Sequence, residues 1–186
     1  MYKTSLVWSI KEFKYTDSSS NREKMKTYLT VFFNSDGDRP SKVTKTFKDL
    51  GFKLTRGDYD YRYDWDDETP ADQIESIGDK IQELLKGKKI LFQIENSEGG
   101  KHQEPDEDEM KTYLKLVFRS ECGESPSVID EKIADLMDIG FEPIKGEYNY
   151  VYRWPDESNI EGALEIADRV YKALKGCGVF FKLKTV

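Results

Sequence analysis

The chain has 186 residues, of which 35% are charged and 13% aromatic, and its formal net charge is −7. This negative charge argues against nucleic acid and against an anionic membrane surface as partners, because both are bound through Lys and Arg. No apolar run reaches the ~20 residues of a membrane-spanning helix, and the N-terminus lacks the apolar core and cleavage site of a signal peptide. The sequence therefore predicts a cytoplasmic protein that binds neither nucleic acid nor membrane.

The first 24 residues precede the repeated part of the chain. Leu6, Trp8 and Ile10 stand at every second position, which is the period of a β-strand with one buried face. We therefore expect residues 1–24 to supply an additional strand, docked on one of the sheets described below, and a connector.

The rest of the sequence occurs twice. Residues 25–35, MKTYLTVFFNS, return as MKTYLKLVFRS at 110–120, and residues 51–65 return in similar form at 140–154. Self-similarity at a fixed distance indicates a tandem duplication. We place the two copies at 25–97 and 110–186, with an acidic linker containing Gly and Pro at 98–109.

The elements of the first copy follow from its composition and its Gly and Pro residues. Pro40 suits the first turn of a helix, and Gly51 and Gly87 suit helix ends. Arg56-Gly57 suits a hairpin turn between two β-rich segments. The expected elements are, in chain order, a strand at 28–33, a helix at 40–50, strands at 52–55 and 59–65, a helix at 70–86 and a strand at 90–94.

The second copy has the same order, with about four more residues, or one turn, in its first helix. The order β-α-β-β-α-β is that of a ferredoxin-like unit, whose four antiparallel strands lie in the order 4-1-3-2 with both helices on one face. The predicted fold class is therefore α+β. It comprises two ferredoxin-like units in tandem, each with a four-stranded antiparallel sheet and helices on one face, plus the N-terminal strand.

A ladder of aromatic residues in the third strand of each copy has two interpretations. Its members are Tyr59, Tyr61, Tyr63 and Trp65 in copy one, and Tyr148, Tyr150, Tyr152 and Trp154 in copy two. Such a ladder could stack on bases, or it could pack beneath the helices. Asp58, Asp60, Arg62 and Asp64 fall on the opposite face and suit solvent, so we expect the ladder to face the helices.

The strand faces opposite the helices are half apolar, and such a face favours a partner. The two sheets could pack face to face, which we prefer because each copy is small, or the faces could bind another protein or a small molecule. The candidate partner or ligand face consists of Tyr28, Phe32, Tyr113, Val117 and Phe180.

Acidic residues also follow the expected strands of copy one, where we expect them to gather at one edge of the sheet. They are Asp36, Asp38, Asp66, Asp67 and Glu68. Clustered carboxylates suit Mg²⁺ or Ca²⁺, but acids near helix N-termini also complement the helix dipole. We prefer the second explanation and expect no cofactor.

No catalytic set emerges from the sequence. The only histidine, His102, lies in the linker, and there is no glycine-rich phosphate loop. Cys122 and Cys177 are expected to be neighbouring free thiols. The sequence thus predicts a non-catalytic protein-interaction or regulatory module that binds a protein partner or a second copy of itself. The alternatives are a small-ligand binder with a pocket between the copies, or a divalent-metal-dependent enzyme that uses the acidic edge.

Overall fold

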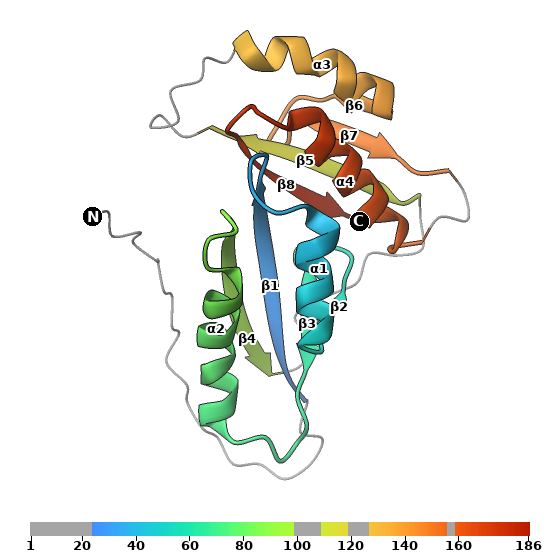
Figure 1. Ribbon diagram of the computed structural model, residues 1–186. Coiled ribbons are helices and arrows are strands. Elements are labelled where there is room, and N and C mark those ends of the chain that lie inside the picture. Colours follow the sequence, from blue (N-terminus) through green and yellow to red (C-terminus); the bar gives the residue numbers. More distant parts are fainter. Residues whose placement is uncertain (1–23, 99–108, 119–126, 156–158) are drawn as a thin grey trace.

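The computed structural model describes residues 24–98, 109–118, 127–155 and 159–186. These residues form a mixed α+β fold with one antiparallel sheet of eight strands and four helices (Figure 1). The expected N-terminal strand, nearly all of the expected linker, and Cys122 lie outside the described residues. The expected neighbour of Cys122, Cys177, is buried.

The elements of the two halves follow the same order. The first half contains β1 (Met25–Asn34), α1 (Pro40–Asp49), β2 (Lys53–Leu54), β3 (Tyr61–Asp64), α2 (Ala71–Leu85) and β4 (Leu91–Glu98). The second half contains β5 (Lys111–Val117), α3 (Ser127–Ile139), β6 (Phe141–Pro143), β7 (Tyr150–Arg153), α4 (Gly162–Leu174) and β8 (Phe180–Thr185). The expected β-α-β-β-α-β order is thus present in each half.

Strand pairing within each half also matches the expected order. β1 lies between β3 and β4, and β2 pairs with β3. In the same way β5 lies between β7 and β8, and β6 pairs with β7. All of these pairs are antiparallel, so both halves have the order 4-1-3-2.

The expectation of two separate sheets was wrong, because β1 joins them. β1 has 10 residues and β3 has 4, so β1 runs on past the end of β3 with unpaired backbone groups. Its last residues, Phe33 and Asn34, pair with Phe181 and Phe180 of β8. Unpaired backbone groups are costly to bury, and the outer edge of β8 satisfies those of β1.

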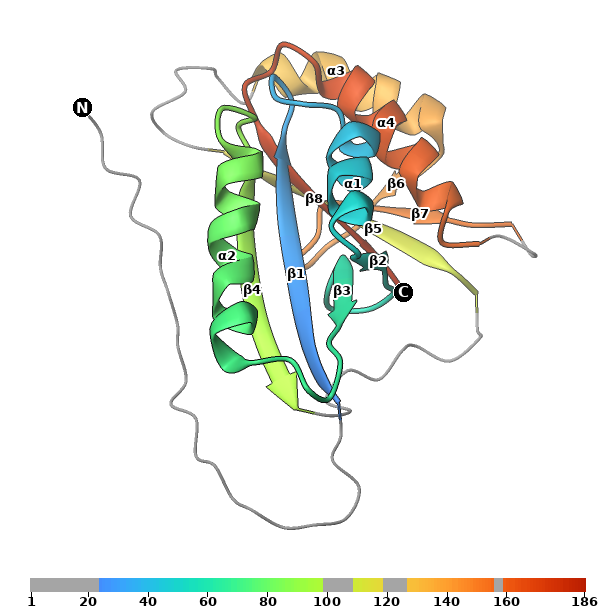
Figure 2. The same ribbon diagram turned by 60° about the horizontal axis from the view of Figure 1, so that its bottom comes forward.

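The helices and the joined sheet enclose one hydrophobic core. In Figures 1 and 2, α2 and α1 lie over the first half of the sheet, and α4 lies next to α1 over the second. The core is continuous across both halves, and its fully buried members include Leu29, Val43, Phe47, Tyr61, Ile81, Leu114, Leu136, Phe141, Val170, Leu174 and Phe181.

Most of the aromatic ladder lies in this core, as expected. Tyr61 is 2% exposed and Tyr150 is 8% exposed, and the Tyr61 hydroxyl is 2.6 Å from Thr44 Oγ1 on α1. The prediction was wrong for Tyr148, which precedes β7 and packs on Tyr113 of the helix-free face. It was also wrong for Tyr59, which precedes β3 and stacks on Tyr28 with the ring centroids 4.7 Å apart. The chain does not yet follow the alternation of β3 at this residue, so its side chain lies on the other face.

Two equivalent glycines make room for ladder tyrosines. Gly51 and Gly140 have φ angles of +98° and +109°, in the left-handed region that favours glycine. A Cβ atom on Gly51 would lie 2.9 Å from the Tyr63 ring, and one on Gly140 would lie 3.0 Å from the Tyr152 ring. Each glycine therefore lets the chain turn at the end of a helix and leaves room for a ladder tyrosine from β3 or β7.

We predict that Tyr61→Ala and Tyr150→Ala will each lower the free energy of unfolding by about 3 to 5 kcal/mol, because each removes a buried aromatic ring. Tyr61→Phe keeps the ring and serves as the control, with a loss of about 1 to 3 kcal/mol from the unpaired Thr44 hydroxyl. Urea unfolding followed by circular dichroism measures all three. Midpoints unchanged in both alanine variants would contradict the core assignment.

Candidate functional site

The helix-free face of the sheet carries two tyrosine pairs at equivalent positions. Tyr28 stacks on Tyr59 and is only 2% exposed. Tyr113 packs on Tyr148 with the ring centroids 5.5 Å apart, and it remains half-buried. The hydroxyl of Tyr59 donates a hydrogen bond of 2.7 Å to Glu95 of β4. Tyr28 is therefore covered by its own half of the chain and does not offer a free ring to a partner.

The other three residues of the expected face lie together at the junction of the halves. Phe180 of β8 pairs with Val117 of β5 on one side and with Asn34 of β1 on the other. Phe32 is two residues from Asn34, and its ring lies 5.8 Å from Lys182 Nζ. Phe180 is buried, whereas Phe32 and Val117 are half-buried. Whether these residues contact a partner stays a prediction.

Hydrogen bonds occupy the outer edge of β8 at both of its ends. Ser35 N–H donates to Val179 O at 2.9 Å, and Gly57 N–H donates to Thr185 O at 2.7 Å. The side chain of Lys184 donates to Asp58 Oδ1 at 2.7 Å. The first half of the chain thus contacts β8 both at the end of β1 and through the turn between β2 and β3.

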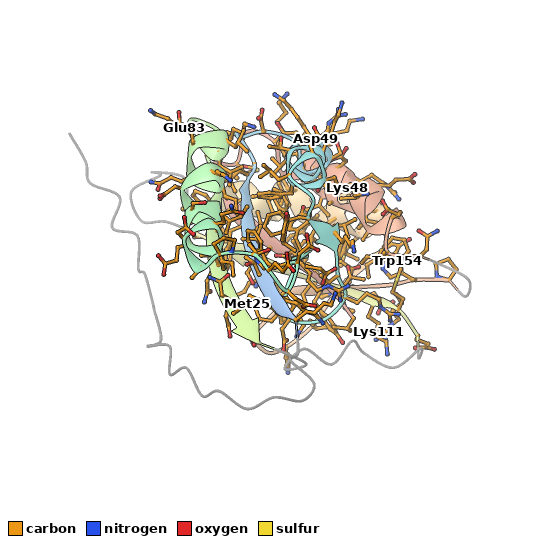
Figure 3. The ribbon with its side chains drawn as sticks, turned by 90° about the horizontal axis from the view of Figure 1, so that it is seen from below. Met25, Lys48, Asp49, Glu83, Lys111 and Trp154 are labelled. Carbon is orange, nitrogen blue, oxygen red and sulfur yellow. The ribbon has the colours of Figure 1, made fainter. Side chains whose placement is uncertain are left out.

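The helix side of the junction is fixed by polar contacts between α1 and α4. Ser41 N–H donates to Asp168 Oδ1 at 3.0 Å, which satisfies a backbone donor at the start of α1. Lys48, which faces α4 (Figure 3), donates to Glu161 Oε2 at 2.7 Å. Contacts along the β8 edge and contacts between the helices therefore hold the two halves together.

A half-buried carboxyl group, that of Asp60 just before β3, lies against β1 at the junction of the halves. Asp60 Oδ2 accepts a hydrogen bond of 2.7 Å from Val31 N–H, at the point where β1 has left β3 and has not yet reached β8. The sequence prediction that Asp60 faces solvent was wrong. Burial raises its pKa to about 7, against smaller opposing effects of Lys182 and the Val31 N–H.

The second half makes the same contact with a neutral group. Asn149 Oδ1 accepts a hydrogen bond of 2.8 Å from Leu116 N–H, and Asn149 occupies the repeat position of Asp60. Aligning the two similar stretches of sequence would have revealed this position, since each residue directly precedes a buried ladder tyrosine, Tyr61 or Tyr150. The pair offers a matched comparison of a charged and an uncharged acceptor.

We predict that Asp60→Asn will stabilise the chain at pH 8 and leave its stability nearly unchanged at pH 4. The pKa of Asp60 is higher in the folded chain, at about 7, than its ordinary value of 3.8. Folding therefore takes up a proton between about pH 4 and pH 7, and wild-type stability falls as pH rises through that window. The gain at pH 8 should be on the order of 3 kcal/mol, measured by urea unfolding at both pH values.

Asn149→Asp is the matched control for this prediction. It should introduce a loss of stability of the same sign as pH rises, and a smaller one because Asn149 is exposed whereas Asp60 is half-buried. An equal gain from Asp60→Asn at pH 4 and pH 8 would show that the charge of Asp60 is not the cause.

The outer edge of β4 presents backbone groups that no other described strand pairs. Within the described residues β4 pairs with β1 alone. Leu29 O and Val31 N–H both bond to Asp60, so the odd-numbered residues of β1 direct their backbone groups toward the β3 side. The even-numbered residues of β1 therefore direct their backbone N–H and C=O groups toward β4. By the alternation of an antiparallel pair, Phe92, Ile94 and Asn96 then direct their backbone N–H and C=O groups outward.

β4 and β8 are the equivalent last strands of the two halves, but only β8 has a described strand paired along part of its outer edge. Phe181 of β8 pairs with β1 and is 0% exposed, whereas Phe92, its counterpart in β4, is only half-buried. The remaining edges of the sheet are β2 and β6, with 2 and 3 residues against the 8 of β4. The β4 edge is thus the longest one left uncovered in the described part of the chain.

The acidic residues do not gather at one edge, so that expectation was wrong. β1 and β3 are antiparallel, with Lys26 opposite Asp64. Asp36 and Asp38 therefore lie beyond the end of β1, and residues 66–68 lie near its start. Asp36 Oδ1 accepts a hydrogen bond from Gly176 N–H at 2.9 Å. No group of three or more His, Cys, Asp or Glu residues suited to a metal ion occurs within the described ranges.

We predict that millimolar Mg²⁺ or Ca²⁺ will shift the melting temperature by less than about 1 °C, because ligand binding to the native state is what raises it. Differential scanning fluorimetry with and without EDTA provides the measurement. A clear rise that Asp36→Asn with Asp38→Asn abolishes would contradict the prediction, and Asp66→Asn with Asp67→Asn is the control at the other end of the sheet.

Comparison with known proteins assigns no family. No protein-family model matches the chain, and no curated protein matches it either. Among solved structures, a crystal structure described provisionally as a glycine cleavage system transcriptional repressor matches with 12% identity and a TM-score of 0.32. The match covers 88% of this chain and 98% of that chain. At this TM-score the likeness adds nothing to the assignment of function. No helix among the described residues is long and apolar enough to span a membrane.

Proposed function

We propose that the protein is a non-catalytic interaction module that binds an extended segment of a protein partner at the outer edge of β4. The carrying observation is the edge itself, with 8 residues paired on one side only by a described strand. An edge strand offers a row of backbone donors and acceptors to another strand. Soluble proteins usually keep such edges short or covered, as β2 and β6 are short here.

The side chains of β4 suit this role. Phe92 and Ile94 are half-buried against the core on the helix side, so a strand added beside them can bury more apolar surface. Glu95 on the other face accepts a hydrogen bond from Tyr59, which fixes it away from the edge. In strand addition the backbone supplies affinity and alternate side chains supply specificity.

We also propose that the two halves are copies of one ferredoxin-like unit and that the protein acts in the cytoplasm. Equivalent hydrogen bonds support the first point. Trp65 Nε1–H donates to Thr27 Oγ1 at 2.7 Å, and Trp154 Nε1–H donates to Thr112 Oγ1 at 2.8 Å. Repeated polar contacts of this kind are difficult to explain by fold alone, since they require the same residue types at the same places.

The small-ligand alternative has less support. It placed a pocket between the copies, lined by Tyr28, Phe32, Tyr113 and Val117. Tyr28 is 2% exposed beneath Tyr59, and β8 lies paired between β1 and β5 at the junction. The strands of the two halves thus lie side by side in one sheet at the junction. This arrangement supports a surface there and gives no support to a pocket enclosed between the halves.

A display library of peptides of about ten residues tests the proposed function. We predict that bound peptides will have alternating apolar residues and will shift the NMR signals of the Phe92, Ile94 and Asn96 amides. Ile94→Pro should reduce affinity by at least about tenfold, because proline removes an outward N–H and crowds the edge.

Ile94→Ala is the control, because it shortens the same side chain and keeps the backbone N–H. It should retain most of the affinity. Peptides whose binding shifts α1, α3 or α4 instead, or is insensitive to Ile94→Pro, would contradict a binding site at the β4 edge.

A further inference from the structure

We infer that the extended segment bound at the β4 edge is β4 of a second copy of the chain, so that the protein forms a two-fold dimer through this strand. The inference rests on the proposed function, because it names the partner of the same edge. Two copies of one surface bind each other about a two-fold axis only if that surface is complementary to itself. The β4 edge meets this condition in one register.

The β4 edge lacks the features with which soluble proteins block an exposed strand. Such features include proline, lysine, bulges and short length. β6 contains Pro143 and β2 begins with Lys53. β4 contains neither residue type, and its 8 residues pair with β1 in one unbroken register. The strand is therefore regular enough to take a neighbour along its whole outer side.

The outward backbone groups determine which registers a second copy of β4 can adopt. They belong to Phe92, Ile94 and Asn96, and an antiparallel neighbour must place its own outward residues opposite them. When Ile94 lies opposite Ile94 of the second copy, Phe92 lies opposite Asn96. All three residues then exchange hydrogen bonds with the other copy, and the paired stretch runs from Leu91 to Ser97 in each chain. Registers centred on Gln93 or Asn96 pair fewer residues of β4.

Charge selects the register centred on Ile94 over the one centred on Glu95. Gln93 and Glu95 are exposed and share the helix-free face of β4. In the register centred on Ile94, the amide of Gln93 faces the carboxylate of Glu95 from the other copy, and the two-fold axis repeats this pair. In the register centred on Glu95, the two carboxylates face each other directly, which is destabilising. The edge is therefore self-complementary about Ile94.

A second copy also supplies apolar cover that a single peptide strand lacks. Phe92 and Ile94 are half-buried on the helix side of β4, whereas Phe181, the counterpart of Phe92 in β8, is 0% exposed. α2 lies over this side of the sheet (Figures 1 and 2), and its Leu84 is 38% exposed. A two-fold axis perpendicular to the sheet keeps the helices of both copies on one face. Each copy thus brings both a strand and a helix to the apolar side of the edge.

Sedimentation equilibrium of the full chain over a range of concentrations tests the inference, and we expect a reversible equilibrium between monomer and dimer. Gln93→Glu places a carboxylate opposite each Glu95 and should raise the dissociation constant of the dimer by about fivefold. Gln93→Lys places an ammonium group there and should lower the dissociation constant by about as much.

Ser97→Glu and Ser97→Lys are the matched controls, because Ser97 lies on the same face of β4 but opposite the uncharged Leu91 of the other copy. They make the same changes of net charge and should alter the dissociation constant by less than about twofold. Circular dichroism checks that every variant is folded.

Amide hydrogen exchange by NMR locates the interface. Protection of the Phe92, Ile94 and Asn96 amides should rise with protein concentration, in step with the fraction of dimer. A chain that stays monomeric up to its solubility limit would overturn the inference. Protection that is independent of concentration, or Gln93→Glu and Gln93→Lys variants that change the dissociation constant in the same direction, would also overturn it.

The peptide screen separates this inference from the proposed function. Peptides that shift the β4 amides of a chain that stays monomeric would overturn the second copy as the partner and leave the proposed function standing. A chain that neither dimerises nor binds peptides would overturn both. A dimer that bound peptides dissociate would support both, because the peptide and the second copy would then compete for one edge.

Discussion

The arrangement of the molecule depends on the pairing of β1 with β8. Only Phe33 and Asn34 of β1 enter this pairing, but they turn two four-stranded sheets into one and bring α1 beside α4. A small α+β unit buries a limited part of its surface, and a shared core relieves that limit. The contacts between the helices, such as Ser41 with Asp168, then need no large interface of their own, because the sheet already fixes the distance between them.

The joint makes two similar halves different. Where β1 passes from β3 to β8, the backbone N–H of Val31 lies between strand partners, and the half-buried Asp60 carboxyl just before β3 accepts a hydrogen bond from it. The second half uses Asn149 for the same purpose. A half-buried carboxyl at this place ties the stability of the junction to pH, because its charged form must be partly desolvated. An amide has no such dependence.

The two halves also differ in which strand edges the described residues cover. The outer edge of β8 pairs with β1 at one end and bonds to the turn at Gly57 at the other. The first half of the chain therefore occupies the side of β8 where another strand would have to bind. β4 stands at the equivalent place in the first half, and its edge has no such cover from the described residues. One of the two equivalent edges is thus used to join the halves, and the other is the edge that we propose for partner binding.

The sequence by itself determined the elements, their order and the strand order within each half, because hydrophobic period, turn glycines and helix-start prolines act locally and occur twice. It also placed Tyr61 and Tyr150 in the core. Only the tertiary structure decided the joining of the sheets, since the pairing of Phe33 with Phe181 depends on how far β1 outruns β3. The partial burial of Asp60 and the stacking of Tyr59 on Tyr28 arise because both residues precede β3, where the chain does not yet follow the alternation of that strand. The separation of the acidic residues follows from strand direction. The β4 edge, longer than those of β2 and β6, is left without a described neighbour only because β1 joins β8 instead.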